Sequence, residues 1–263
     1  MDSNFFNALL SESIERVKYL VEKNRDCIKT KTDKGRTPVF VVAMSGRSDG
    51  VAVIKYLAEQ GADLDARDNS NLSPMDLAAM SNRIEIIGCL AVLGANVDTK
   101  DNKRNNQTPM FVAAAKGQTD AIKSLAAFGA KVDATDDDGA TPIFKAAQAG
   151  QTEAIKCLAN LKADVNARDS GNMTPMFMAA GSGEVACIDC LKELGADIDA
   201  KIGNGMTPMF LAVSESQIAS MKCLKKWGAK MDIKANNGMS LMDLAINSGQ
   251  SKAAEWLRAN GVQ

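Results

Sequence analysis

The chain has 263 residues, with 31 Lys and Arg against 32 Asp and Glu and no histidine. The missing histidine excludes Ser-His-Asp and Cys-His catalytic arrangements, every zinc site that needs an imidazole, and an imidazole pH switch. A formal net charge of -1 argues against a general nucleic-acid-binding or anionic-membrane-binding surface.

The N-terminal residues, Met1 to Phe6, carry neither the positive charge nor the long apolar run of a secretory signal. No stretch is apolar over the length that a membrane helix needs. We therefore expect the protein in the cytoplasm or another reducing intracellular compartment, not secreted, with its six cysteines as free thiols.

Two sequence markers repeat along the chain. A Thr/Ser-Pro pair begins at Thr37, Ser73, Thr108, Thr141, Thr174 and Thr207, with a decayed copy at Ser240. A glycine, replaced once by lysine, follows each at Gly61, Gly94, Gly129, Lys162, Gly195, Gly228 and Gly261. From Thr108 onward the first marker returns every 33 residues, so the chain is built of repeats of one unit.

One copy predicts the structure of the unit. Residues 141–150 are expected to form a short helix, with Thr141 as N-cap and Pro142 in the first turn. Residues 152–161 repeat apolar side chains at helical spacing, and the polar residues 162–169 form an extended connection, here called a finger. Extra residues near 45–50 and 103–106 are polar and are expected in solvent-facing loops.

Only Gly or Asn occurs two residues before each Thr/Ser, which predicts a positive backbone φ angle there. These residues are Gly35, Asn71, Asn106, Gly139, Asn172, Gly205 and Gly238. Turn chemistry followed by a helix cap also creates N-glycosylation patterns at three of them, and without a signal peptide we do not expect glycosylation.

A 33-residue unit with T-P-x-x-x-A followed by G-A-D resembles the ankyrin repeat. The resemblance covers essentially the whole chain and implies an all-α solenoid of stacked helix-turn-helix units with short β-hairpin fingers, forming one domain over residues 1–263. Residues 3–24 resemble an N-terminal capping helix pair and residues 240–263 a C-terminal capping repeat, giving about eight helix pairs.

The family usually has histidine two residues after the proline, and this chain departs from that pattern. The position holds Phe40, Asp76, Phe111, Phe144, Phe177, Phe210 and Asp243. We therefore expect the family's side-chain hydrogen bonds to be absent there and stacking to depend more on apolar burial.

Three motifs suggest chemistry but fit the repeat better. Cys187 and Cys190 form a C-x-x-C, yet Cys190 shares its repeat position with Tyr, Ser and Trp, which favours core packing over metal or redox chemistry. The run 136–138 of three aspartates lacks the spacing of a calcium loop and is expected at a solvated finger tip. Gly181 to Gly183 lies between two helices and is no phosphate loop. We expect no metal, no cofactor and no catalytic residues.

Surface recognition is the role that remains. Met173, Met206 and Met239 precede their Thr/Ser, at a position where the family's fingers face partners, and would form an adaptable apolar stripe. Packing between fingers is the alternative interpretation. With the ends of the short helices, the complete candidate surface is Arg36, Met44, Met80, Lys116, Gln148, Met173, Met206, Ser214, Glu215 and Met239.

Charge is uneven along the chain. Residues 201–263 hold 8 basic and 4 acidic side chains, so their net charge is +4. Lys222, Lys225, Lys226 and Lys230 cluster there, either as a plain polar helix face or as a patch for an acidic partner. Nearby Trp227 is either a packing residue or, if exposed, an anchor for a partner.

The sequence thus predicts a non-catalytic module that binds one or more proteins through its fingers and concave face, as an interaction scaffold or as a constitutive subunit of a large assembly. A regulator or inhibitor of a partner enzyme is the alternative. Nucleic acid, membrane insertion and a small-molecule substrate are not expected.

Overall fold

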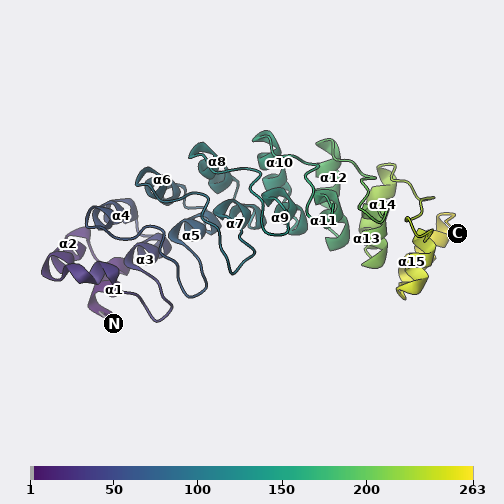
Figure 1. Ribbon diagram of the computed structural model, residues 1–263. Helices are drawn as coiled ribbons and strands as arrows, with labels where there is room; N and C mark the ends of the chain where they lie inside the picture. The colour runs from purple at the N-terminus through teal and green to yellow at the C-terminus, as the bar shows by residue number, and fades with distance from the viewer. Residues whose placement is uncertain (1–2, 263) are drawn as a thin grey trace. The chain divides into compact units, whose positions relative to one another are not determined.

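A computed structural model describes residues 3–262, which form pairs of antiparallel helices joined by turns and fingers (Figure 1). The early helices are α1 (Ser3–Ser11), α2 (Ile14–Lys23), the 3-10 helix η1 (Arg25–Lys29), α3 (Pro38–Ser45), α4 (Gly50–Glu59), α5 (Pro74–Met80), α6 (Ile84–Val92), α7 (Pro109–Ala115) and α8 (Thr119–Ala127). The later ones are α9 (Pro142–Gln148), α10 (Thr152–Asn160), α11 (Pro175–Ser182), α12 (Val185–Glu193), α13 (Pro208–Ser214), α14 (Ile218–Lys226), α15 (Leu241–Asn247) and α16 (Ser251–Ala259).

The chain divides into two compact units. Unit 1 comprises described residues 3–113 and 118–131, and unit 2 comprises 114–117 and 132–262. Within each unit a short helix packs on the next short helix and a long helix on the next long one, as α3 does on α5 and α12 on α14. The eight predicted helix pairs are present, whereas one domain over residues 1–263 stays a prediction.

The Thr-Pro marker starts a short helix as expected. At α3, Thr37 has an extended backbone, its hydroxyl accepts a hydrogen bond from the Phe40 N–H at 3.4 Å, and Pro38 lies in the first turn. The helix ends at Gly46, whose left-handed φ of 73° terminates it. The predicted positive φ is also confirmed at the position two residues before each marker, from Gly35 (74°) to Gly238 (82°).

Phenylalanines in place of histidine build the core. Phe40 and Phe111 in unit 1 and Phe144, Phe177 and Phe210 in unit 2 are at most 2% exposed, which confirms apolar burial at the five phenylalanine copies. The expectation that side-chain hydrogen bonds are absent is wrong at the two aspartate copies: Asp76 and Asp243 each accept the backbone N–H of the serine that caps their helix. Neighbouring hydroxyls have lost a partner: the Oγ1 atoms of Thr108, Thr141, Thr174 and Thr207 are buried without a hydrogen bond among the described residues. Burial of the rings outweighs these unpaired groups.

Aspartates at the finger starts tie one repeat to the next. In unit 1, Asp98 accepts a hydrogen bond from the Lys131 N–H at 3.2 Å. In unit 2, Asp133 accepts one from the Asp164 N–H at 3.2 Å, and Asp199 one from the Lys230 N–H at 3.1 Å. These carboxylates are therefore structural, since each satisfies a backbone donor of the following finger.

The fingers are turns rather than β-hairpins with regular strands. Over residues 3–262 the bridges are isolated ones, Asp101 with Gln107 and Lys234 with Ser240. Each finger closes through a few local bonds, such as Asp136 N–H to the Ala140 carbonyl at 3.0 Å, so too little ladder forms for a strand.

Two loop expectations need correction. The insertion near residues 45–50 is not simply solvated: the Arg47 side chain is 7% exposed and donates to the carbonyls of Ala8 and Leu9 at 3.1 and 3.0 Å. It thereby satisfies the free carbonyl end of α1. Asp136 is likewise buried, because its carboxylate accepts the N–H groups of Asp138 and Ala140. No described helix is long and apolar enough to cross a membrane.

Candidate protein-binding surface

Unit 2 carries an apolar hollow of about 160 Å³ on the side of its short helices. We call it the groove, and its lining residues are Met173, Phe177, Ile202, Met206, Phe210, Leu211, Ser214 and Leu244. Met173 and Met206 come from two successive fingers and are half-buried, as is Ser214. The structure thus brings three of the predicted surface residues together.

The groove exists because a finger residue changes type. In earlier fingers an aspartate closes the turn, as Asp169 does by accepting the N–H groups of Gly171 and Met173 at 2.9 and 2.8 Å. Ile202 holds that position in the next finger, and Asn204 accepts the Met206 N–H at 3.1 Å instead. At the groove, the aliphatic side chain of Ile202 thus stands where earlier fingers have a carboxylate.

Leu211 forms another wall of the groove and depends on a glycine in the neighbouring helix. Gly181 lies inside α11 and not in the turn between two helices, where the sequence placed it. A Cβ added to Gly181 would lie 2.8 Å from the Leu211 Cδ2 atom of α13. Glycine therefore lets this leucine lie close against α11.

Two cations flank the groove in unit 2. The Arg168 guanidinium Nη1 donates to the carbonyls of Asn172 at 2.9 Å and Lys201 at 3.0 Å, so it bridges the two fingers that hold Met173 and Ile202. Lys201, beside Ile202, is exposed. Neither side chain forms an ion pair with a residue in the described range, although Asp169 carries a negative charge nearby.

In unit 1 the arginines of the fingers are paired with carboxylates. Arg36 lies 3.6 Å from the Asp68 carboxylate and Arg67 lies 3.5 Å from that of Asp76. Arg104 pairs with Asp101.

The two most deeply buried carboxylates of unit 1, Asp76 and Asp101, have pKa values shifted in opposite directions. Burial raises the pKa of Asp76, more than its hydrogen bonds from Ser73 and its nearby arginines lower it. Burial also raises the pKa of Asp101, but hydrogen bonds from Asn71, Arg104 and the Lys103 N–H outweigh burial and the net pKa is lowered.

The other predicted surface residues lie outside the groove. Arg36 is occupied, since it also lies over the Phe40 ring at 5.3 Å and contacts the Met44 sulfur at 3.2 Å. Met239 is half-buried in the finger after the groove, so the three methionines do not form one continuous lining. The remaining residues are Met80, half-buried, and Met44, Lys116, Gln148 and Glu215, exposed.

The lysine cluster is partly occupied. The Lys226 ammonium lies 3.8 Å from the Asp189 carboxylate, and Lys225 donates to the Asn260 side chain at 2.6 Å. Trp227 is half-buried and donates from Nε1 to Asp189, which supports packing over an exposed anchor. The hydrogen bond from Trp227 lowers the pKa of Asp189 most, and the nearby Cys223 and Lys226 lower it further.

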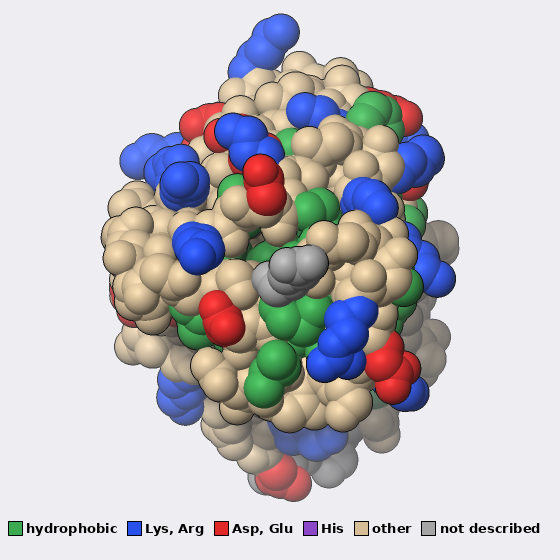
Figure 2. Space-filling view, turned by 90° about the vertical axis from the view of Figure 1, so that its right-hand side faces the viewer, with side chains coloured by type: hydrophobic (Ala, Val, Ile, Leu, Met, Phe, Trp, Pro, Cys, Tyr) green, Lys and Arg blue, Asp and Glu red, His purple; other side chains and the backbone are tan. Residues whose placement is uncertain are grey.

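Lys222 and Lys230 are exposed, and within the described chain their side chains form neither an ion pair nor a hydrogen bond. Figure 2 shows blue Lys and Arg side chains spread over the face around the C-terminal end, with green hydrophobic side chains near its middle.

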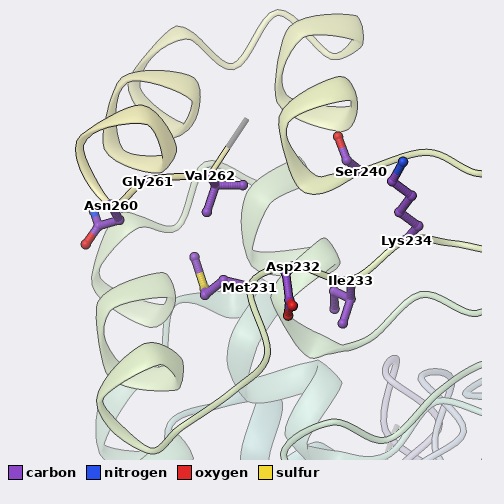
Figure 3. A pocket seen from close by; sticks show the side chains of 8 residues that line it. All are labelled: Met231, Asp232, Ile233, Lys234, Ser240, Asn260, Gly261 and Val262. Carbon is purple, nitrogen blue, oxygen red and sulfur yellow. The ribbon is translucent and has the colours of Figure 1, made fainter.

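A second hollow, of about 310 Å³, lies between the last finger and the end of α16 (Figure 3). Met231 and Val262 point toward one another across it, while Lys234 and Ser240 approach each other at its other side. Asp232 points away from the hollow. This mixed lining gives a weaker case for recognition than the groove.

The C-x-x-C pair is part of the core. Cys187 and Cys190 are buried free thiols, 0% and 4% exposed, as the packing interpretation predicts. Burial raises the pKa of Cys187 to about 12, which disfavours the reactive thiolate. Within the part of the chain that the structure covers, no group of three His, Cys, Asp or Glu residues could hold a metal ion.

A family model described as ankyrin repeats (3 copies) matches residues 5–101, 89–169, 110–202 and 176–263. The chain is an ankyrin-repeat protein. Part of this ankyrin-repeat protein is also similar to alpha-latrocrustotoxin-Lt1a of Latrodectus tredecimguttatus, at 33% identity over 82 residues. The similarity covers 31% of this chain and 6% of that relative's length.

Family membership supports a general role and no specific partner. Ankyrin repeats are protein–protein interaction modules and are typically non-catalytic. Sequence reasoning about this ankyrin-repeat protein missed Arg168, Ile202, Leu211 and Leu244 at the groove. Ile202 could have been found from the loss of aspartate at its repeat position, whereas the course of Arg168 between two fingers depends on their spacing in space.

Proposed function

We propose that this ankyrin-repeat protein is a non-catalytic scaffold that binds partner proteins through the fingers and short helices of unit 2. The observation that carries the proposal is the groove itself, an apolar hollow formed by adaptable methionine side chains and open to solvent. A clustered apolar surface is costly to expose unless a partner covers it.

A constitutive subunit of a large assembly is one form of this role, and a regulator or inhibitor acting directly on a partner enzyme is the alternative. We propose a reducing intracellular compartment, in keeping with six buried free thiols. The most deeply buried carboxylates, Asp76 and Asp101, are committed to arginines and backbone donors, which supports a non-catalytic role.

Replacement of Met173, Met206 and Met239 with glutamate tests the surface. We expect partner capture by the full chain to fall at least about tenfold, because charge is placed in an apolar contact. Val92→Glu is the matched control, since Val92 is 74% exposed on α6 of unit 1 and away from the groove.

Stability decides between binding and packing. If the triple variant unfolds far below the melting temperature of the control variant, the methionines serve packing and the site assignment is wrong. The native mass of the protein from its source tests the scaffold role itself. A stable complex of fixed composition supports an assembly subunit, whereas recovery as a lone monomer counts against the scaffold.

A further inference from the structure

The size of the groove limits what it accepts. Its volume of about 160 Å³ is close to that of apolar cavities that hold one benzene-sized group, roughly 150 Å³. Seven of its eight lining side chains are hydrophobic, and Ser214 donates its hydroxyl to the Leu211 carbonyl at 3.0 Å. One large apolar side chain therefore fits the groove better than a polar one.

Charge around the groove limits what flanks that side chain. Arg168 and Lys201 lie on the two fingers that form the groove and have no carboxylate partner in the described chain. Lys234 holds the repeat position of Lys201 in the next finger. Hydrogen bonds from Ser240 lower the pKa of Asp243, and the positive charge of nearby Lys234 lowers it further. The last two fingers have lost the closing aspartate, to Ile202 and Ala235.

We propose that the groove binds an acidic peptide segment of a partner protein, which inserts one large apolar side chain and places carboxylates beside Arg168 and Lys201. This rests on the proposed function, that unit 2 binds proteins. Arg168 reaches the two backbone carbonyls through Nη1 alone, so within the described chain the N–H groups of its Nε and Nη2 atoms remain available as donors. A carboxylate fits the planar edge formed by these donors well.

A random-peptide display library selected on the full chain tests the chemistry without assuming a partner. The enriched peptides are expected to share one bulky apolar residue with at least two Asp or Glu residues near it. Their affinity should fall several-fold between 50 and 500 mM salt, about what screening of two charge pairs produces.

Substitutions then locate the binding. Lys201→Glu should weaken the selected peptides by about tenfold, and Met206→Glu by more, whereas Met206→Leu conserves volume and should bind within about twofold of the wild type. Lys222→Glu, on the long helix α14, is the charge-matched control and should change nothing. Lys201 is exposed, so its variant is expected to fold even if Met206→Glu does not.

Two outcomes overturn the inference while leaving the proposed function in place: enrichment of basic or uncharged peptides, or acidic peptides whose binding depends on Lys222 and not on Lys201. Self-association of the chain at the concentrations used, abolished by Lys201→Glu, would instead identify a second copy as the occupant and also overturns it. Failure to enrich any peptide, together with a lone monomer from the source, removes both the inference and the proposed function.

Discussion

Arg67 in unit 1 and Arg168 in unit 2 hold the same place in the repeat. Each donates to the carbonyl of its own finger and to that of the next, Asn71 and Lys100 for the first, Asn172 and Lys201 for the second. The side chain beside each arginine at the third position of the short helix differs. Arg67 faces the carboxylate of Asp76, whereas Phe177 holds the equivalent position in unit 2.

The same repeat position thus produces two kinds of local surface. In the α5 repeat of unit 1, Asp76 inside the short helix satisfies both a helix cap and Arg67, so these charges are used within the fold. In the α11 repeat of unit 2, Phe177 contributes burial, and Arg168 keeps unused donors beside an apolar groove. A surface whose charges are satisfied internally offers a partner less than one whose cations are free.

The largest expected effect concerns the thiols of the two units. Since the pKa of Cys187 is about 12, its alkylation by iodoacetamide at pH 8 should be slower than in the unfolded chain by a factor on the order of 10³. Mass spectrometry of the labelled peptides measures each site. Cys89 in unit 1 and Cys190 in unit 2 share a repeat position, and burial raises the pKa of both. Rates more than tenfold apart would show that one unit opens more readily.

Placing the aspartate of unit 1 at the equivalent phenylalanine position of unit 2 should lower the free energy of unfolding. Phe177→Asp removes a ring that is 1% exposed, and we expect the free energy of unfolding to fall by about 3 kcal/mol, allowing for a new cap and ion pair. Urea unfolding measures it. A loss below about 1 kcal/mol would mean that Thr174 and Arg168 can adopt the unit 1 arrangement, and the two solutions would then be interchangeable.

Asp101 and Asp76 of unit 1 should respond to pH in opposite senses. Asp101 has a lowered pKa, so it stabilises the fold above its unfolded pKa of about 3.9 and this contribution is lost as pH falls. Asp101→Asn should therefore cost about 1–2 kcal/mol at pH 7 and less at pH 3.

Asp76 has a raised pKa, so its protonated form is favoured in the folded state and this advantage is lost as pH rises through the folded pKa. Asp76→Asn should be more destabilising at pH 4 than at pH 7. Urea unfolding of both variants across this range checks the signs, and parallel pH profiles would contradict the assignment.

The smallest effect concerns a backbone position. Lys162 has a φ of 72° where the repeat otherwise places glycine, as at Gly129 with 85°. Lys162→Gly in unit 2 should stabilise by about 1 kcal/mol because the left-handed conformation strains a lysine. Gly129→Lys in unit 1 should lose about as much, and thermal unfolding of the pair measures both. No change in either variant would show that the local backbone relaxes.

The repeat made most of the fold predictable from the sequence. Thr-Pro pairs located the short helices, and Gly or Asn before them located the positive φ angles, because both follow from local backbone chemistry. The position shared by Cys190 with Tyr, Ser and Trp correctly indicated packing.

The groove was only half predictable. Met173 and Met206 stood out, but Ile202 and Leu211 reach the same hollow from another finger and another helix, and their meeting depends on how repeats stack. Arg47 escaped for the same reason: a residue that looks like loop in the sequence binds the end of a helix about 40 positions earlier, at Ala8.

The 33-residue spacing in unit 2 makes the length of this protein adjustable in whole steps. Loss of residues 133–165 would join Val132 to Asn166, which does for the Asp197 N–H what Asp133 does for Asp164. Every residue of the groove and both of its cations would remain. The lining of the groove and the number of repeats before it are thus independent, so evolution or an engineer can change the length of the chain without changing the residues of the groove.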